Sequence, residues 1–326
     1  MPITPAQLAA TPDHFLHRFE GEDAIFVAMD AAAYRRSIFL DRRISPAGDQ
    51  EIQLAVAALI HLPVQPATPP PLGWIFHMAH CGSTLLARAL GELGDNIVLR
   101  EPFALRQLAF EPDPARLALV MAMLARRYAA HAPTIVKANV PVNFLLPAIT
   151  ARDPGARAIM LHCQLPDYLL AILRSDNHRG WLRNVTTQLG GNLGDLSRAS
   201  DAQRAAALWL AQTRRFADAL GAMPDARSLD AERFFAKPGA TLAAVADHLG
   251  VAARPDAIAA LVAGPLFATY SKNPALAFDN AARLARREVL EPALAAEIGA
   301  ARHWLDRTAG DLDAIRSTIR AHALIA

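Results

Sequence analysis

A short polar turn between two apolar segments is the part of the sequence best suited to chemistry. Residues 73–78 are mostly apolar and follow three prolines at 69–71, which bar a helix from entering them, so they predict a buried strand. Leucines spaced three and four apart predict a helix over residues 83–93. The turn between them carries a glycine and two hydroxyl side chains. A strand that passes through such a turn into a helix directs backbone N–H groups and the positive end of the helix dipole to one point, where phosphate binds.

The turn lacks the lysine of a Walker A loop, because Gly82 is followed directly by Ser83. Phosphoryl transfer assisted by magnesium would therefore lose two of its usual parts. The turn instead resembles the 5′-phosphosulfate-binding loop of sulfotransferases, which has a basic residue, a small residue, glycine and two Ser/Thr before a helix. In this sequence those positions are held by His80, Cys81, Gly82, Ser83 and Thr84. The family usually has Arg or Lys in place of His80, and Ser or Thr in place of Cys81.

The resemblance extends over about residues 73–275 and implies a donor, an acceptor and a fold. The donor is adenosine 3′-phosphate 5′-phosphosulfate (PAPS), bound through residues 80–84, with a cationic His80 stabilising the bridging oxygen. The acceptor is a small molecule with a hydroxyl or amine. The fold is that of P-loop NTPases, a parallel sheet with helices on both faces. No metal is needed, since the loop and basic side chains supply the positive field.

Two ionisable residues follow later strands and are candidates for catalysis. Glu101 lies at the carboxyl end of a strand expected over residues 96–99, the edge at which open parallel sheets bind ligands. The resemblance implies that Glu101 takes the proton of the acceptor, and that Lys137 directs a cation at the transferred group or the acceptor. The alternatives are an ion pair of Glu101 with Arg100 or Arg106, and a Lys137 that only extends along the sheet edge.

The segment that resembles the site for the donor's 3′-phosphate departs from the family pattern. When Pro166 is set on the family's proline, Gln164 takes the place of the usual arginine and Ile172 that of the usual serine. A dianionic phosphate without charge-assisted hydrogen bonds would lose much of its binding energy. The expected substitutes are Arg174, Ser175, Lys272, Arg283 and Arg287.

The elements that must position these residues alternate between strands and helices. Strands are expected over 73–78, 96–99, 134–139, 156–162 and 226–232. With helical patterns between them, they predict an α/β fold with three layers and a parallel sheet. Residues 1–70 are expected to form an N-terminal extension on the core, and 71–326 the sulfotransferase-like domain with its C-terminal helices. The polar segment 176–200 predicts a long loop that forms a lid over the acceptor.

Composition limits the classes of function. The 326 residues are 53% hydrophobic and 20% charged, enough for a sizeable core, and the net charge of +2 comes without basic blocks, which argues against nucleic-acid binding. The longest apolar runs are too short to cross a membrane. Two cysteines and an N-terminus without a secretory pattern predict a cytoplasmic protein.

Two alternative functions remain open at this point. One is a protein that keeps the fold but binds a different phosphorylated ligand, or acts only as a binding module, as the missing 3′-phosphate ligands suggest. The other follows from two His-Cys pairs, His80-Cys81 and His162-Cys163, at the ends of expected strands. Two histidines and two cysteines are ligands that zinc prefers, although adjacent residues on a strand point to opposite faces.

Overall fold

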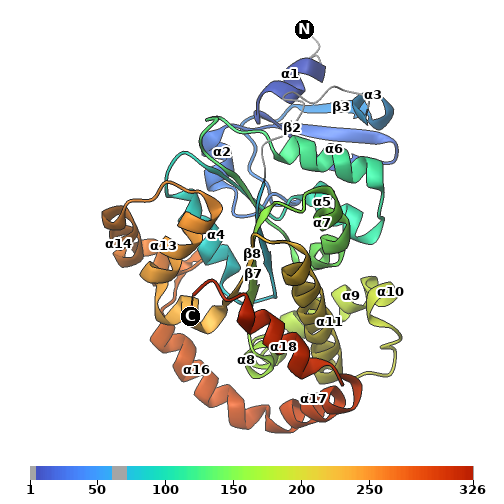
Figure 1. Cartoon of the computed structure of the whole chain (residues 1–326), viewed down its shortest axis with the longest axis vertical. Helices are drawn as coiled ribbons and strands as arrows, with labels where there is room; N and C mark the ends of the chain where they lie inside the picture. The colour runs from blue at the N-terminus through green and yellow to red at the C-terminus, as the bar shows by residue number, and fades with distance from the viewer. Residues whose placement is uncertain (1–4, 61–71, 326) are drawn as a thin grey trace.

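The computed structural model describes residues 5–60 and 72–325. At its centre five strands form a parallel sheet in the order β5-β6-β4-β7-β8 (Figure 1). Their bounds are β4 Gly73–His77, β5 Ile97–Arg100, β6 Thr134–Lys137, β7 Arg157–His162 and β8 Ala226–Asp230. Every residue of β4, β5 and β6 is buried, as expected for strands covered on both faces. The predicted α/β fold with a parallel sheet is confirmed.

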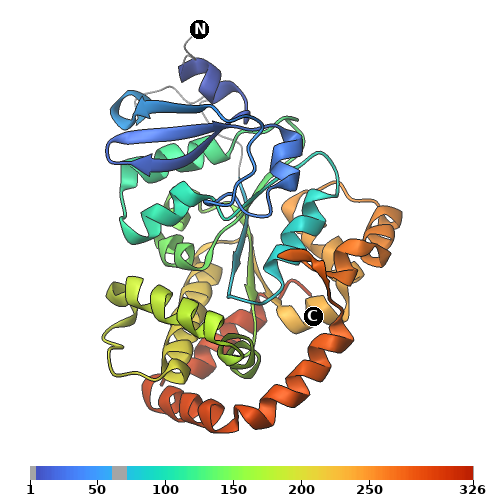
Figure 2. The ribbon, with the colours of Figure 1, turned by 180° about the vertical axis from the view of Figure 1, so that it is seen from behind.

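Helices cover both faces of this sheet and complete the three layers (Figures 1 and 2). On one face lie α4 (Ser83–Gly91) and α13 (Pro238–Leu249), and on the other α7 (Leu146–Arg152) and α11 (Asp201–Ala222). The crossovers return each strand parallel to the last, so that the carboxyl ends of all five strands lie at one edge of the sheet. The strands are also connected by α5 Phe103–Phe110, α6 Pro114–Leu124, the 3₁₀ helix η1 Val140–Leu145 and α8 Leu165–Leu173, and α12 Ala231–Ala236 follows β8.

A second, antiparallel sheet precedes the central one. It consists of β1 (His14–Glu20), β2 (Asp23–Ala28) and β3 (Glu51–Ala55) in that order, and β1 packs on α5 and α6. Three short helices accompany it: α1 Pro5–Ala10, α2 Ala31–Arg36 and α3 Val56–Ile60. Buried apolar side chains of both sheets belong to one continuous core. The expected boundary between residues 70 and 71, and the proline-rich connector before it, lie outside the described residues.

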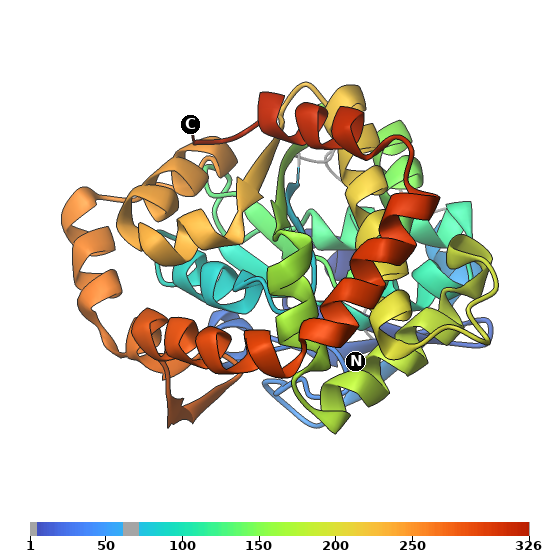
Figure 3. The ribbon, with the colours of Figure 1, turned by 90° about the horizontal axis from the view of Figure 1, so that it is seen from below.

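The C-terminal third closes the carboxyl end of the central sheet. A hairpin of β9 (Thr269–Tyr270) and β10 (Asn273–Ala277) is followed by α16, α17 and α18. Figure 3 looks onto this end of the molecule, which α16 and α17 cross. The remaining bounds are α14 Pro255–Ala263, α15 Pro265–Ala268, α16 Asn280–Ala293, α17 Ala295–Thr308 and α18 Leu312–Ala321. Among residues 5–60 and 72–325, no helix has both the length and the apolar character needed to span a membrane.

The prediction of a long loop over residues 176–200 is wrong. The segment forms α9 (Asp176–Gln188) and α10 (Gly190–Leu193), and only its end is irregular. The Ser175 side chain caps α9 by accepting a hydrogen bond from the His178 N–H at 3.4 Å. Leu182 and Val185 then bury one face of the helix against α8 and α11. The polar majority of the segment is the solvent face of an amphipathic helix.

Candidate active site

The phosphate-loop pattern occurs in the predicted context, between β4 and α4. Gly82 has φ +81° and precedes the first residue of α4, so it adopts a backbone conformation that other residues rarely take. A Cβ atom on Gly82 would lie 2.8 Å from the ring of Phe235, which covers the loop. No side chain caps the N-terminus of α4, and its first N–H groups therefore remain for a ligand. The loop meets the requirements of an anion site.

The other four loop residues differ in what they offer to an anion. The thiol of Cys81 is buried and donates a hydrogen bond to the Met78 carbonyl oxygen at 2.9 Å, and burial raises its pKa to about 11. Cys81 therefore carries no thiolate charge that would repel an anion, and it can contact an anion only through its backbone. Ser83 and Thr84 open α4 and are buried, and the Thr84 hydroxyl has no hydrogen-bond partner among the described residues. An unpartnered buried hydroxyl at a helix N-terminus fits a ligand oxygen.

The surroundings of His80 favour its neutral form in the free protein, and a cationic His80 beside the bound donor stays a prediction. Burial lowers the pKa of His80 well below its usual value, and Lys272, His178 and Arg174 lower it further by electrostatic repulsion. The ring lies on that of His178, with 4.2 Å between the centroids, and meets Trp181 edge-on at 6.3 Å. Protonation of His80 therefore requires a negative charge beside it.

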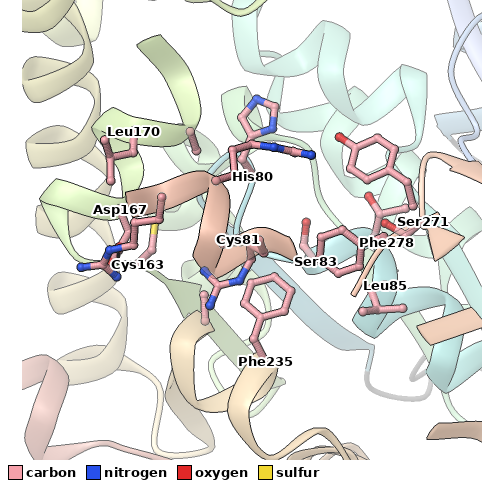
Figure 4. A pocket seen from close by; sticks show the side chains of 18 of the residues that line it. His80, Cys81, Ser83, Leu85, Cys163, Asp167, Leu170, Phe235, Ser271 and Phe278 are labelled. Atoms are coloured by element: carbon pink, nitrogen blue, oxygen red, sulfur yellow. Dashed lines mark ion pairs between the residues drawn. The ribbon is translucent and has the colours of Figure 1, made fainter. Parts of the chain in front are cut away.

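A cavity extends from the loop to the far wall formed by the hairpin and α16 (Figure 4). Its lining includes all five loop residues and five basic side chains, Arg174, Lys272, Arg283, Arg286 and Arg287. Two acidic side chains also line it. Glu232 binds Arg283 at 2.6 and 2.7 Å, and Asp167 binds Arg287 at 2.6 Å.

Three basic side chains of the cavity have no carboxylate partner in the part of the chain that the structure describes. They are Arg174 at the end of α8, Lys272 between β9 and β10, and Arg286 on α16. Arg286 is not among the residues predicted from the sequence. Its spacing of three from Arg283, which places both on one side of α16, is the signal that could have identified it. The cavity therefore combines the helix N-terminus with three basic side chains that form no ion pair with a carboxylate of the described residues.

The residues expected to replace the 3′-phosphate ligands are only partly brought together. Arg174, Lys272 and Arg283 line the cavity, but Arg283 is engaged by Glu232 and lies 4.4 Å over the Phe235 ring. Ser175 is absent from the cavity lining because its hydroxyl caps α9.

The two departures from the family motif have structural roles of their own. Ile172 is fully buried in the core, where no ligand reaches it. Gln164 precedes α8, and its amide nitrogen lies 3.3 Å from Asp230 Oδ2.

Glu101 and Lys137 meet at the carboxyl ends of β5 and β6. The Glu101 N–H donates to the Lys137 carbonyl oxygen at 2.8 Å, and Glu101 has φ +58°, unusual for a residue other than glycine. The Lys137 ammonium, fully buried, donates directly to the Glu101 carboxylate, whose side chain is 16% exposed. The partner of Glu101 is therefore Lys137 rather than Arg100 or Arg106.

Opposing effects act on the Glu101 carboxyl. Burial by itself would raise its pKa, but the positive charge of Lys137, with smaller effects of His77 and Lys272, outweighs burial and lowers the pKa to about 2. Glu101 is thus a carboxylate at neutral pH. Lys272 also acts on His80, so the hairpin carries one positive charge that both Glu101 and the phosphate loop experience.

The zinc alternative finds no support in side-chain positions. Within residues 5–60 and 72–325, no group of three or more His, Cys, Asp or Glu side chains is arranged to hold a metal ion. Both thiols are buried, and burial raises the pKa of Cys163 as it does that of Cys81. The His162 and Cys163 side chains line a groove between α12 and α18, and Cys163 also lines the cavity at the phosphate loop.

Comparison with known proteins yields matches among solved structures alone. No protein-family model matches the chain, and no curated protein matches it. A sulfotransferase from Alicyclobacillus acidocaldarius aligns with 72% of this chain and 97% of its own, at 13% identity and a TM-score of 0.37. The sulfotransferase domain from the curacin biosynthetic pathway aligns with 69% of this chain and 98% of its own, at 13% identity and a TM-score of 0.41. The functional argument therefore rests on the residues of the site.

Proposed function

We propose that the protein is a sulfotransferase that moves a sulfuryl group from PAPS to a hydroxyl or amine of a small-molecule acceptor. The observation that carries the proposal is the cavity that joins an uncapped helix N-terminus to three basic side chains without carboxylate partners. PAPS has two phosphate groups and a sulfate, and a phosphate monoester alone carries about −1.5 to −2 charges at neutral pH. The positive charge of the cavity suits such a ligand.

Each part of the donor has suitable residues in the cavity. The N–H groups of residues 80–84 and the hydroxyls of Ser83 and Thr84 would hold the phosphosulfate. Lys272 and Arg286 would bind the 3′-phosphate in place of the missing family ligands, by charge-assisted hydrogen bonds. Phe235 and Phe278, whose rings lie 6.2 Å apart, offer aromatic surfaces for the base.

Other residues would take the proton from the acceptor and stabilise the negative charge that develops on the departing nucleotide. When bound, PAPS supplies an activated sulfuryl group: the acceptor oxygen or nitrogen bonds to sulfur as the bond from sulfur to the phosphate oxygen breaks. Glu101 is the candidate base that takes the proton of the acceptor. It is ionised, but it pairs with Lys137 and lies outside the cavity lining, and its pKa of about 2 makes it a weak base until the charge of Lys137 is offset. Lys137 holds the Glu101 carboxylate in place, and the loop N–H groups stabilise the charge left on adenosine 3′,5′-bisphosphate.

A second candidate function keeps the cavity but changes the ligand. Ile172 lies in the core and Gln164 contacts Asp230, so neither provides the charge of the family's 3′-phosphate site. A phosphorylated ligand with one anionic group, bound with or without catalysis, would need only the loop and Arg174.

Calorimetric titration distinguishes the two functions. We expect adenosine 3′,5′-bisphosphate to bind roughly 10²-fold more tightly than adenosine 5′-phosphate, because two additional charge-assisted hydrogen bonds form. Lys272→Ala and Arg286→Ala should each remove about tenfold of that preference, whereas Lys237→Ala, outside the cavity lining, should leave it unchanged. Equal affinity for the two nucleotides would overturn the PAPS assignment in favour of the second function. If adenosine 3′,5′-bisphosphate does bind more tightly, Glu101→Gln should abolish sulfuryl transfer to a panel of alcohols, phenols and amines, while the bisphosphate still binds.

A further inference from the structure

His178 on α9 connects the phosphate loop to Arg174, which lines the cavity. Its ring lies against the ring of His80, with the centroids 4.2 Å apart, and both residues are partly buried. On its other side, Arg174 Nε lies 3.1 Å from His178 Nδ1 and donates a hydrogen bond to it. One histidine thus contacts both the loop that would bind the phosphosulfate and an arginine that lines the same cavity.

His178 Nδ1 lies within hydrogen-bond distance of two groups, a donor and an acceptor, and cannot bond to both at once. His178 Nδ1 also lies 3.0 Å from the carbonyl oxygen of Ala171, in the last turn of α8. To bind Arg174, Nδ1 must accept a hydrogen bond and carry no proton; to bind the carbonyl oxygen, it must carry one. Arg174 Nη2 also lies 3.5 Å from His178 Nε2, so either neutral tautomer keeps one ring nitrogen that can accept from Arg174. Protonation makes both ring nitrogens donors, so that His178 can no longer accept from Arg174 but still donates to the Ala171 oxygen. A cation at a helix C-terminus is also favoured by the helix dipole.

The charges around the two rings favour their neutral forms in the free protein. Burial lowers the pKa of His178, and Arg174 and Lys272 lower it further, while the Ala171 oxygen raises it. The ionisable side chains that act most strongly on His80 are all basic: Lys272, His178, Arg174 and His77. A negative ligand in the cavity would reverse this balance for His178, and a charged His178 then opposes a second proton on His80.

We propose that His178 acts as a latch. In the free protein the His178 ring holds the guanidinium of Arg174 by a hydrogen bond. When His178 takes up a proton, it releases this guanidinium to the bound anion. This inference rests on the proposed function for the identity of the anion, a phosphosulfate or phosphate group at the loop. As the anion enters, one proton from solvent binds at His178 Nδ1, which then donates to the Ala171 oxygen. Arg174 loses its acceptor and turns its N–H groups to the anion. His178 is a positioning residue and touches no ligand itself.

Proton uptake on binding is the quantity that tests the latch. Titration calorimetry at pH 7 in two buffers of different ionisation enthalpy measures it, with adenosine 5′-phosphosulfate as the probe, because this nucleotide has no group that titrates between pH 6 and 8. We expect uptake of about one proton by the wild-type protein, and an affinity that falls roughly tenfold for each unit of rising pH. His178→Asn should bind with almost no uptake and little dependence on pH. His131→Asn, a change at an exposed histidine whose side chain is 76% exposed, should behave as wild type.

A second measurement needs no ligand. In the free protein labelled with ¹⁵N, the Arg174 Nε–H resonance should shift between pH 8 and 5 with the same midpoint as the His178 ring, and this response should vanish in His178→Asn. Proton uptake that is unchanged in His178→Asn, or an Arg174 resonance that ignores the titration of His178, would overturn the latch. Failure of every nucleotide to bind, with the linked NMR titration intact, would overturn the proposed function and leave the latch standing.

Discussion

Glu101 and Lys137 place opposite charges at a part of the sheet edge that water barely reaches. The folded protein holds the pKa of Glu101 at about 2, against a usual value of 4.5, because Lys137 outweighs the effect of burial. A carboxyl whose pKa is lowered by folding adds stability above its unfolded pKa, and this stability is lost as pH falls. The loss should therefore begin near pH 4.5 and be complete near pH 2. The difference corresponds to roughly 3 kcal/mol of unfolding free energy.

Breaking this pair from one side should cost more than removing it altogether. Glu101→Gln leaves the buried Lys137 ammonium without its counter-charge, and we expect it to lower the unfolding free energy by about 3 kcal/mol at pH 7. Lys137→Met should have a similar effect, and Glu101→Gln/Lys137→Met should lose much less than the sum of the two. Urea unfolding at pH 7 and pH 3 provides the measurement. If the double variant lost as much stability as wild type between these pH values, the pair would not be the source of the acid sensitivity.

At the scale of elements, the sequence predicts those helices, strands and turns whose residue pattern is contained in one short segment. The loop pattern, the strand before it and the helix after it are encoded within residues 73–93, and all three were confirmed. The segment 176–200 was mistaken for a loop because its polar residues include the whole exposed face of α9. Only packing of α9 against α8 and α11 reveals its buried face. The same tertiary contacts bring His178 to His80, which no local pattern indicates.

Two glycine-to-alanine substitutions should have opposite effects on stability, one in the phosphate loop and one in an exposed helix. Gly82→Ala combines a positive φ with a Cβ that would meet Phe235 at 2.8 Å, so we expect a loss of roughly 2 kcal/mol in unfolding free energy and weaker nucleotide binding. Gly299→Ala, in the exposed part of α17 with open space around it, should gain about 0.5–1 kcal/mol. Thermal unfolding with and without adenosine 3′,5′-bisphosphate measures both effects. Wild-type stability and affinity in Gly82→Ala would show that the loop does not need its glycine.

At the scale of the whole molecule, buried arginines join the N-terminal segment to the central sheet. Arg100, at the end of β5 and only 3% exposed, donates to the carbonyl oxygens of Tyr34, Arg35 and Ser37. Arg126, after α6, donates to those of Leu8, Thr11 and His14. Composition does not distinguish these two from the many arginines that lie on the surface. The sequence therefore predicted an extension that packs on the core, but not the contacts that hold it there.

These contacts predict that the two sheets unfold together. Hydrogen exchange should give the amides of β1–β3 the same opening free energy as those of β4 and β7. Arg100→Met and Arg126→Met each leave several carbonyl oxygens without a donor, and each should lower both values together, by about 2–4 kcal/mol. Arg254→Met is the matched control, because that side chain is 81% exposed and, among the described residues, bonds only to neighbouring Asp256; it should change either value by less than about 0.5 kcal/mol. Earlier exchange of β1–β3 in the wild-type protein would instead make the N-terminal sheet a separate unit, because contacts that fail to couple two elements leave each with its own stability.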